Sequence, residues 1–274
     1  MKKPPAFRPI DPAKPAVGLV FLEPSTRTAV SFIRACQRIG LNHVLVLSKG
    51  TSIEKGETVE DTLRNLKAMG MGSFVIRTQV TGGLQGCRDL GLGPVVNAGD
   101  GVGEHPTQAL LDLTTLLDLV HWDEGRLRAL KIGIYGDLRH SRVAQSWSKL
   151  ARKLGIRLTL MSPEEWRPAW AVDHDWSDSR SAIKDQDVVM ALRVQRERMD
   201  GPAAAVTEAF VNNFRLGRRD LAEHQRLMHP GPINWGVELE PDWLEDPRSL
   251  ILKQAEMGVL LRAKLLEWVL ETKS

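Results

Sequence analysis

Basic side chains recur in this sequence directly after apolar runs that are typical of buried strands. Arg27 lies in "EPSTRT", His105 lies in "GEHPTQALLDL" and Arg142 lies in "YGDLRHSR". Each falls in the predicted first turn of a helix, where a cation meets the positive end of the helix dipole and unpaired backbone N–H groups. Because helix N-termini attract anions, cations can gather there when an anion lies between them and the N–H groups. The pattern predicts a ligand with several negative charges. The hydroxyl groups of Ser25, Thr26 and Thr28, beside Arg27, would also donate to this ligand.

Three further basic residues extend this pattern. Arg77 ends the apolar run "SFVIRT", Arg193 follows "DVVMAL", and Lys55 lies in the polar loop "TSIEKGET". Taken alone, each of them is more typical of a solvated surface residue, because arginine and lysine are seldom buried. Together they favour a binding site, since the ligands of open parallel sheets lie beyond the carboxyl ends of the strands.

Short apolar runs alternate with segments of helical periodicity along the chain. This alternation is typical of right-handed βαβ units and a mostly parallel sheet. The predicted strands are 17–22, 43–48, 73–78, 94–99, 131–137, 157–162 and 187–194, and the predicted helices are 27–39, 58–69, 105–120, 142–154 and 254–271. The sequence thus predicts an α/β protein of two domains, each a mostly parallel sheet flanked by helices, with the C-terminal helix docking back on the body.

The most polar break in the middle of the sequence is "LVHWDEGRLRAL" at 119–130, which we interpret as a hinge between the two domains. The predicted first domain covers 1–121 and is joined by the C-terminal helix at 252–274. The predicted second domain covers 122–251.

Composition narrows the class of protein. A net charge of +3 without a basic run does not favour nucleic acid as a partner. No apolar stretch approaches about 18 residues, so we expect no membrane span. Cys36 and Cys87 are the only cysteines, and we expect two reduced, buried thiols in a cytoplasmic protein. No His, Cys and Asp residues cluster at metal-ligand spacing, so we expect neither a metal nor a cofactor.

Six motifs in a fixed order carry a resemblance to a known family. They are "FLEPSTRT", "SIEKGET", "NAGDGVGEHPTQALLDL", "GDLRHSR", "RVQRER" and "HPGPIN". In this order they resemble the motifs of the aspartate/ornithine transcarbamylase family, and the resemblance extends from around Pro15 to the end of the chain. Within the family, "RVQRER" and "HPGP" favour the aspartate enzymes, because ornithine enzymes carry a cysteine in the last motif and must hold an ammonium group. The planar fork of arginine instead suits carboxylates.

The resemblance implies a reaction and an assembly. The carbamoyl group of carbamoyl phosphate would pass to the α-amine of L-aspartate, giving N-carbamoyl-L-aspartate and phosphate in de novo pyrimidine biosynthesis. The first domain would bind carbamoyl phosphate and the second domain aspartate. The enzyme would be a cytoplasmic homotrimer whose active sites are shared between subunits, and the resemblance leaves open an assembly with dihydroorotase or a regulatory subunit.

The resemblance also implies roles for individual residues. Those expected in catalysis are Arg27, Thr28, Lys55, Arg77 and His105. Those expected to bind carbamoyl phosphate are Ser25, Thr26, Arg27, Thr28, Ser52, Arg77, His105, Gln108 and Pro230. Those expected to bind aspartate are Lys55, Arg142, Arg193, Gln195, Gly231 and Pro232. Ser52 and Lys55 would reach the site from the neighbouring subunit.

Three features depart from the family pattern. The first strand follows a proline-rich start, predicted as an extended lead-in, without the one or two helices usual there, and Ala29 and Trp235 stand where relatives often have arginine. In relatives those helices pack against the C-terminal helix. We therefore expect the apolar face of helix 254–271 to be covered by the lead-in or by a partner chain. This face consists of Val259, Leu260, Leu266, Val269 and Leu270.

Two other functions fit the motifs. One is a transcarbamylase that acts on another amino acid, and the other is a non-catalytic transcarbamylase-fold subunit that scaffolds another pyrimidine enzyme. A simple anion-binding module would leave Arg193 and Gln195 without a role. Because every motif residue expected to carry the chemistry is present, the sequence favours catalysis.

Overall fold

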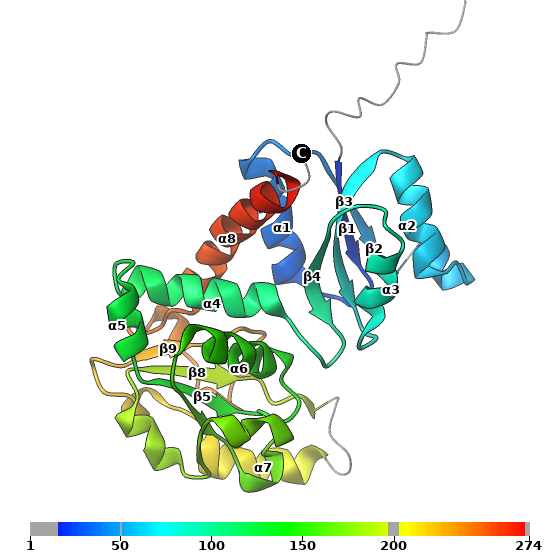
Figure 1. The fold of residues 1–274 in the computed structure, drawn as a ribbon. Coiled ribbons are helices and arrows are strands. Elements are labelled where there is room, and N and C mark those ends of the chain that lie inside the picture. The colour runs from blue at the N-terminus through cyan, green and yellow to red at the C-terminus, as the bar shows by residue number, and fades with distance from the viewer. Residues whose placement is uncertain (1–15, 50, 197–202, 272–274) are drawn as a thin grey trace, which may run out of the picture. The chain divides into compact units, whose positions relative to one another are not determined.

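The computed structural model of this 274-residue chain describes residues 16–49, 51–196 and 203–271. The strands are β1 (Ala16–Phe21), β2 (His43–Leu47), β3 (Met71–Thr78), β4 (Val95–Asp100), β5 (Ile132–Gly136), β6 (Leu158–Met161), β7 (Asp175–Ser177), β8 (Val188–Leu192) and β9 (Arg226–Met228). The α-helices are α1 (Thr26–Arg38), α2 (Val59–Ala68), α3 (Gly83–Asp89), α4 (Pro106–Leu119), α5 (Glu124–Ala129), α6 (Arg142–Leu154), α7 (Ala203–Phe214) and α8 (Ile251–Glu271) (Figure 1).

Every strand and helix predicted from the sequence is confirmed, with ends shifted by a few residues. The described chain adds the strands β7 and β9 and the helices α3, α5 and α7, which the sequence did not predict. The proline-rich start, predicted as an extended lead-in, lies outside the described residues. Among the described helices, none is both long and apolar enough to cross a membrane.

The chain divides into two compact units, one of residues 1–100 and 262–274 and the other of residues 101–261. The predicted hinge at 119–130 contains α5 and lies inside the second of these compact units, and it stays a prediction. In this division α4 belongs to the core of the second unit, and its Asp112 carboxylate accepts a hydrogen bond from Nε1 of Trp147 in α6 at 3.1 Å. The predicted functional boundaries, 121/122 and 251/252, stay a prediction.

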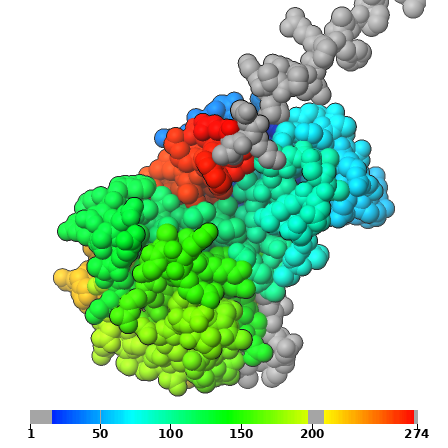
Figure 2. Space-filling view, in the orientation of Figure 1, coloured from blue at the N-terminus to red at the C-terminus, as the bar shows by residue number. Residues whose placement is uncertain are grey.

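The first unit contains a parallel sheet in the strand order β2-β1-β3-β4. Leu19 and Phe21 of β1 pack with α1 and the end of α8, whereas Val20 packs with α2 and α3 on the opposite face. Figure 2 shows α1 in blue and the end of α8 in red side by side at the surface of this unit. Cys36 and Cys87 are buried free thiols, as predicted, and burial raises the pKa of Cys36 to about 11.

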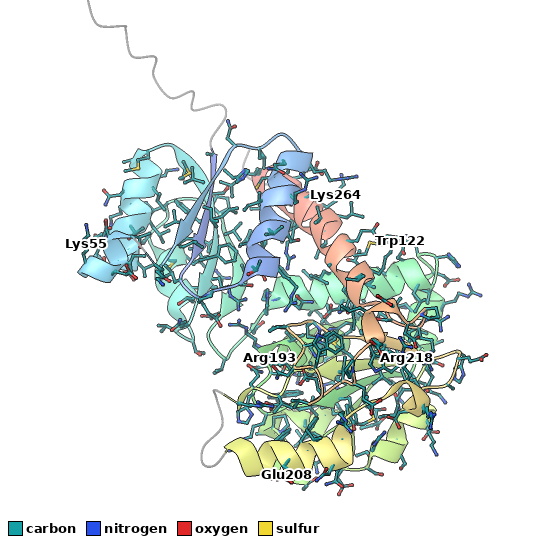
Figure 3. The ribbon with its side chains drawn as sticks, turned by 180° about the vertical axis from the view of Figure 1, so that it is seen from behind. Lys55, Trp122, Arg193, Glu208, Arg218 and Lys264 are labelled. Atoms are coloured by element: carbon teal, nitrogen blue, oxygen red, sulfur yellow. The ribbon has the colours of Figure 1, made fainter. Side chains whose placement is uncertain are left out.

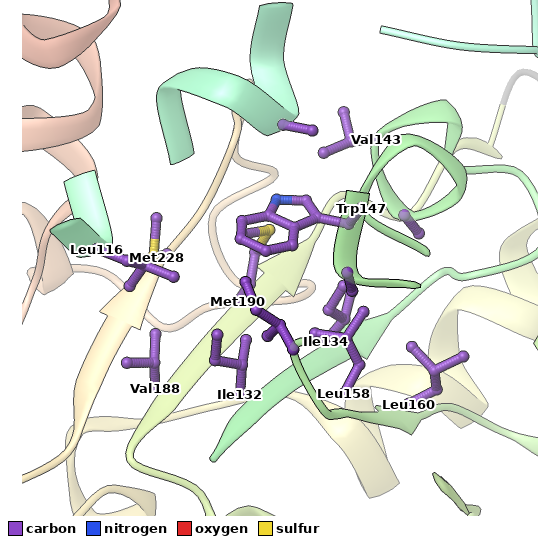
Figure 4. Packing of buried hydrophobic residues seen from close by; sticks show 14 of the residues in the cluster. Leu116, Ile132, Ile134, Val143, Trp147, Leu158, Leu160, Val188, Met190 and Met228 are labelled. Atoms are coloured by element: carbon purple, nitrogen blue, oxygen red, sulfur yellow. The ribbon is translucent and has the colours of Figure 1, made fainter. Parts of the chain in front are cut away.

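The second unit contains a parallel sheet in the order β7-β6-β5-β8-β9. On one face, the fully buried Trp147 packs against Ile134 of β5 and Met190 of β8 (Figure 4). On the other face, the hydroxyl of Tyr135 donates to the Phe214 carbonyl at 2.7 Å. Because both faces are covered, every residue of β5 and β8 is buried and neither strand carries a charged side chain.

The last helix, α8, contributes to both units. Ala263 and Leu266 belong to the core of the first unit, and Val269 packs against that core. In the second unit, Nε2 of Gln254 donates to Oδ1 of Asp112 at 2.7 Å. The predicted docking of the C-terminal helix is therefore confirmed, while a cover for the rest of its apolar face stays a prediction.

A buried carboxylate stabilises the loop before α8. Asp246 accepts hydrogen bonds from Arg248 through Nε at 2.9 Å, Nη2 at 2.7 Å and the backbone N–H at 2.9 Å. Arg218 adds an ion pair, with its Nε 3.4 Å from Oδ2 of Asp246. The hydrogen bonds from Arg248 are the main cause that lowers the pKa of Asp246 to about 2. A lowered pKa means that this stabilisation is present above the ordinary carboxyl pKa of 3.8 and is lost as the pH falls toward about 2.

We expect Asp246→Asn to lower the free energy of unfolding at neutral pH by about 1–2 kcal/mol. The difference between variant and wild type should shrink as the pH falls from about 4 to about 2, because the native carboxylate is then protonated. Urea unfolding across this pH range measures both values. Asp178→Asn, at an exposed position, is the control, and a difference that stays constant with pH would contradict the assignment.

Candidate active site

The first helix of the first unit begins at the predicted anion-binding motif. Ser25 is the N-cap residue of α1, and its side chain makes no capping hydrogen bond in the described structure. In the turn that follows, Thr26 and Arg27 are exposed and Thr28 is buried. A first turn of this kind offers backbone N–H groups, hydroxyls and a guanidinium to one anion.

Arg77 lies at the same edge of the sheet, near the end of β3. It pairs in register with Phe21 of β1, so it lies beside the turn that leads into α1. Arg77 is 8% exposed. Its Nη1 donates to the Ala98 carbonyl at 3.3 Å, and its Nη2 lies 3.1 Å from Oε2 of Glu23. Glu23 was not singled out from the sequence. It orients Arg77 and balances its charge, which offsets the cost of burying a cation.

Ser52 and Lys55 occupy a short 3-10 helix, η1 (Ser52–Lys55), between β2 and α2. Both residues are exposed. Figure 3 shows Lys55 beside α2, on the face of the sheet opposite to α1. A single chain therefore does not gather Ser52 and Lys55 with the first turn of α1.

Two predicted residues lie at the start of α4 in the second unit. His105 is the buried N-cap residue, and its backbone N–H donates to Oγ of Ser146 in α6 at 2.9 Å. One turn later, Nε2 of the buried Gln108 donates to Oδ1 of Asp112 at 2.9 Å. Because this amide nitrogen is engaged, the amide oxygen is the Gln108 atom suited to accept a hydrogen bond from a ligand.

Arg142 is the first residue of α6, after the strand β5. The hydroxyl of the N-cap residue Ser141 accepts from the Ala144 N–H at 3.3 Å and fixes the start of the helix. Arg142 is 7% exposed, and its Nη1 donates to the Gly101 carbonyl at 2.7 Å. This contact orients a planar group that, with five N–H donors, can bind a carboxylate through two of them.

The segment after β8 carries Arg193, labelled in Figure 3, and Gln195. The backbone N–H of Gln195 donates to Oδ2 of Asp137 at 2.9 Å, and its Nε2 donates to the His140 carbonyl at 2.7 Å. Oδ1 of Asp137 accepts from the backbone N–H of His140 at 3.1 Å and lies 2.8 Å from its Nδ1. The buried Asp137 therefore joins the turn after β5 to the segment after β8. Sequence reasoning missed it, although it directly follows the glycine that ends β5.

The loop after β9 contains the last predicted motif. Gly231 has a φ of 65°, a left-handed conformation that favours glycine, and its N–H donates to Nδ1 of His229 at 2.7 Å. The His229 N–H donates to Oε1 of Gln254 at 2.8 Å, and Nδ2 of Asn234 donates to the Val194 carbonyl at 3.1 Å. Pro230 and Pro232 flank Gly231 and are partly or fully exposed.

The strand order determines which of these groups are neighbours. Because β5, β8 and β9 are adjacent and parallel, their carboxyl ends place Arg142, the segment 193–195 and the loop 229–234 at one edge of the second sheet. In the first unit the same principle gathers residues 25–28 with Arg77. The roles assigned to individual residues stay predictions.

Two parallel α/β units with arginines at the carboxyl edges of their sheets define a two-domain protein suited to small anionic ligands. Residues 8–118 match the family model described as aspartate/ornithine carbamoyltransferase, carbamoyl-P binding domain, and residues 128–269 match its Asp/Orn binding domain. The chain therefore belongs to the aspartate/ornithine carbamoyltransferase family.

Individual members of this family are similar along most of their length. An aspartate carbamoyltransferase catalytic subunit of Solibacter usitatus is 40% identical over 258 residues, which cover 92% of this chain and 84% of that protein. The aspartate transcarbamoylase of Trypanosoma cruzi, in complex with carbamoyl phosphate and aspartate, is 28% identical with a TM-score of 0.80, covering 92% of this chain and 83% of its own. The catalytic subunit of the M. jannaschii aspartate transcarbamoylase is 28% identical with a TM-score of 0.81, covering 97% and 88%.

The hydrogen bonds of Asp137 lead to a prediction about the second unit. In Asp137→Asn an amide N–H would face one of the donors on His140 or Gln195, so Gln195 should lose its fixed position. We expect the KM for aspartate to rise about 10–100-fold, the range expected when a charged hydrogen-bond acceptor is lost. The KM for carbamoyl phosphate should change little.

Steady-state kinetics with each substrate varied in turn measures this difference. Asp175→Asn is the control, because Asp175 lies at the opposite, amino end of the sheet in β7 and its carboxylate makes an exposed ion pair with Arg157 at 3.5 Å. An unchanged aspartate KM in a folded Asp137→Asn protein would contradict the role.

Proposed function

We propose that this chain transfers the carbamoyl group of carbamoyl phosphate to the α-amine of L-aspartate, giving N-carbamoyl-L-aspartate and phosphate in pyrimidine biosynthesis in the cytoplasm. The observation that carries the proposal is the match between two basic edges and two family domains. Arg27 and Arg77 lie in the part matched to carbamoyl-P binding, and Arg142 and Arg193 lie in the part matched to Asp/Orn binding. The complex of the trypanosomal relative with carbamoyl phosphate and aspartate supports the same pair of ligands.

The first turn of α1 is the proposed phosphate site. The phosphate would accept from backbone N–H groups of the turn, from the hydroxyls of Ser25, Thr26 and Thr28, and from Arg27. The helix dipole and the guanidinium both favour a dianion there. Arg77, already oriented by Glu23, would bind the same group from β3.

The edge of the second sheet is the proposed aspartate site. Arg142 and Arg193 would bind the two carboxylates, each through two parallel hydrogen bonds. Gln195, Gly231 and Pro232 would enclose the rest of the amino acid. An ornithine side chain would bring its ammonium group toward these arginines, and the repulsion disfavours it.

The chemistry follows from these positions. The amine of aspartate attacks the carbonyl carbon, a C–N bond forms, and the C–O bond to phosphate breaks, while the leaving phosphate accepts the amine proton. Negative charge grows on the carbonyl oxygen during attack, and Thr28, Arg77 and His105 would stabilise it, each donor contributing about 3 kcal/mol. The amide oxygen of Gln108 and the carbonyl of Pro230 would accept from the carbamoyl nitrogen and orient it.

A shared site in a homotrimer is part of the proposal. Ser52 and Lys55 lie on the face of the sheet opposite to α1, so another copy of the chain is the natural source of these residues for each site. The edge strand β2, which directly precedes them, exposes Val44, Leu45 and Leu47 by 42%, 38% and 45%. An exposed apolar edge strand is typical of a surface that another chain covers. Assembly with dihydroorotase or a regulatory subunit stays a prediction from the resemblance.

The direct test is formation of carbamoyl-aspartate by the purified chain. We expect turnover with aspartate and far less with ornithine. Arg27→Ala should keep the fold, because Arg27 is exposed, and should lose activity about 30–150-fold at low carbamoyl phosphate, the equivalent of 2–3 kcal/mol for a charged contact. Preferred turnover of ornithine would point to another amino acid as substrate, and no turnover with any amine would point to a non-catalytic subunit.

Complementation tests the shared site. Lys55→Ala chains and Arg27→Ala chains should each be nearly inactive, and mixing them should restore activity in hybrid assemblies, because some sites then receive Lys55 and Arg27 from intact chains. The control is to mix Lys55→Ala chains with Lys55→Ala, Arg27→Ala double-mutant chains, a combination that can form no intact site. Activity that fails to return in assemblies verified as mixed would refute sharing.

A further inference from the structure

A buried pair of titratable side chains lies under the loop after β9 and has no part in the proposed chemistry. His229 is 2% exposed and Glu238 is fully buried, and Nε2 of His229 lies 3.4 Å from Oε1 of Glu238. A buried carboxylate is destabilising unless hydrogen bonds compensate for its lost hydration. The groups that contact His229 and Glu238 therefore indicate the role of the pair.

The backbone fixes the protonation of the His229 ring. The Gly231 N–H donates to Nδ1 at 2.7 Å, and a ring nitrogen that accepts a hydrogen bond carries no proton. In neutral His229 the proton is therefore on Nε2, the nitrogen that faces Glu238. One imidazole thus accepts from the turn at Gly231 and faces the carboxylate with Nε2 at 3.4 Å.

Glu238 is connected to the segment after β8 through Asn234. Its Oε1 accepts from the backbone N–H of Asn234. The side-chain amide of Asn234 donates to the carbonyl of Val194 at 3.1 Å. Val194 lies between Arg193 and Gln195, the two residues of this segment expected to bind aspartate.

The start of the loop 229–234 is connected through Gln254 and Asp112 to Gln108, a residue expected to bind carbamoyl phosphate. The His229 N–H donates to Oε1 of Gln254, whose Nε2 donates to Oδ1 of Asp112. The same oxygen accepts from Gln108. These links hold the loop from the side of α4 and α8 whether or not the His229–Glu238 pair is intact.

We propose that His229 and Glu238 are positioning residues for the amino-acid substrate. The pair sets the shape of the loop 229–234 and, through Asn234 and Val194, the position of Arg193 and Gln195. This inference rests on the proposed function. The phosphate of carbamoyl phosphate is assigned to the first turn of α1, and this loop offers carbamoyl phosphate only the Pro230 carbonyl, so the pair should affect aspartate more than carbamoyl phosphate.

Kinetics of four variants tests the inference. Glu238→Ala removes the carboxylate that faces His229 and accepts from Asn234, and we expect the aspartate KM to rise about tenfold or more while the carbamoyl-phosphate KM changes less than about threefold. Glu238→Gln keeps an acceptor oxygen and should stay within about threefold of wild type for both substrates. Oε2 of Glu238, which the glutamine NH2 group would replace, has no hydrogen-bond partner among the described residues.

His229→Asn isolates the contact with Glu238. The asparagine oxygen can accept from Gly231 as Nδ1 does, but no atom replaces Nε2, so the aspartate KM should again rise about tenfold. The double variant His229→Asn, Glu238→Ala should be no worse than the more impaired single variant, because residues that act through one contact are not additive.

His174→Asn is the matched control. It removes another imidazole hydrogen bond of the second unit, 2.8 Å from Nε2 of His174 to Oγ of Ser148, just before β7 at the amino end of the sheet. It should lower the melting temperature and leave both KM values unchanged.

Three results would overturn the inference: an aspartate KM within about twofold of wild type in Glu238→Ala, an equal rise for both substrates, or Glu238→Gln as impaired as Glu238→Ala. If Glu238→Ala does not fold, His229→Asn decides by the same criterion. A wild-type chain without activity would refute the proposed function, whereas an active wild type with unaffected variants refutes only the positioning role.

Discussion

All strand pairs in the two described sheets are parallel, and this constraint determines which turns of the chain become neighbours. In a parallel sheet every strand delivers its carboxyl end to the same edge, so residues far apart in sequence meet there. Asp137 and Gln195 are joined in this way across the adjacent strands β5 and β8. The chemistry of each unit therefore depends on strand order more than on any single motif.

The arginines at these edges are oriented before any ligand binds. Arg77 donates to the Ala98 carbonyl and pairs with Glu23, and Arg142 donates to the Gly101 carbonyl. Ordering a long side chain of this type costs about 2 kcal/mol in rotamer entropy. Since folding has already met this cost, less of the interaction energy with an anion is lost on binding.

The sequence was sufficient where its signal is local. The strands β5 and β8 are buried on both faces, so they appear as continuous apolar runs, and the N-cap residues Ser25 and Ser141 directly precede their helices. The strands β7 and β9 are three residues long and offer too few positions for any periodicity. Sequence reasoning alone could not define α3, because two of its seven residues are glycine and glycine disfavours helix.

The site residues that the sequence missed act over long separations. Glu23 pairs with Arg77, and Asp137 accepts from Gln195, and neither of these long-range contacts leaves a pattern in the local sequence. The attachment of α4 to the second core likewise depends on a long-range contact, that of Asp112 with Trp147, which no local window contains.

The division of α8 between the two units has a consequence for how the chain acquires its structure during synthesis. Domains usually fold in the order in which they leave the ribosome. Here the core of the first unit includes Ala263 and Leu266, which are made after the whole of the second unit. The amino-terminal unit is therefore the first to be synthesised and the last to be completed. Until Ala263 and Leu266 are synthesised, Phe21 and Phe32 lack part of the core that buries them.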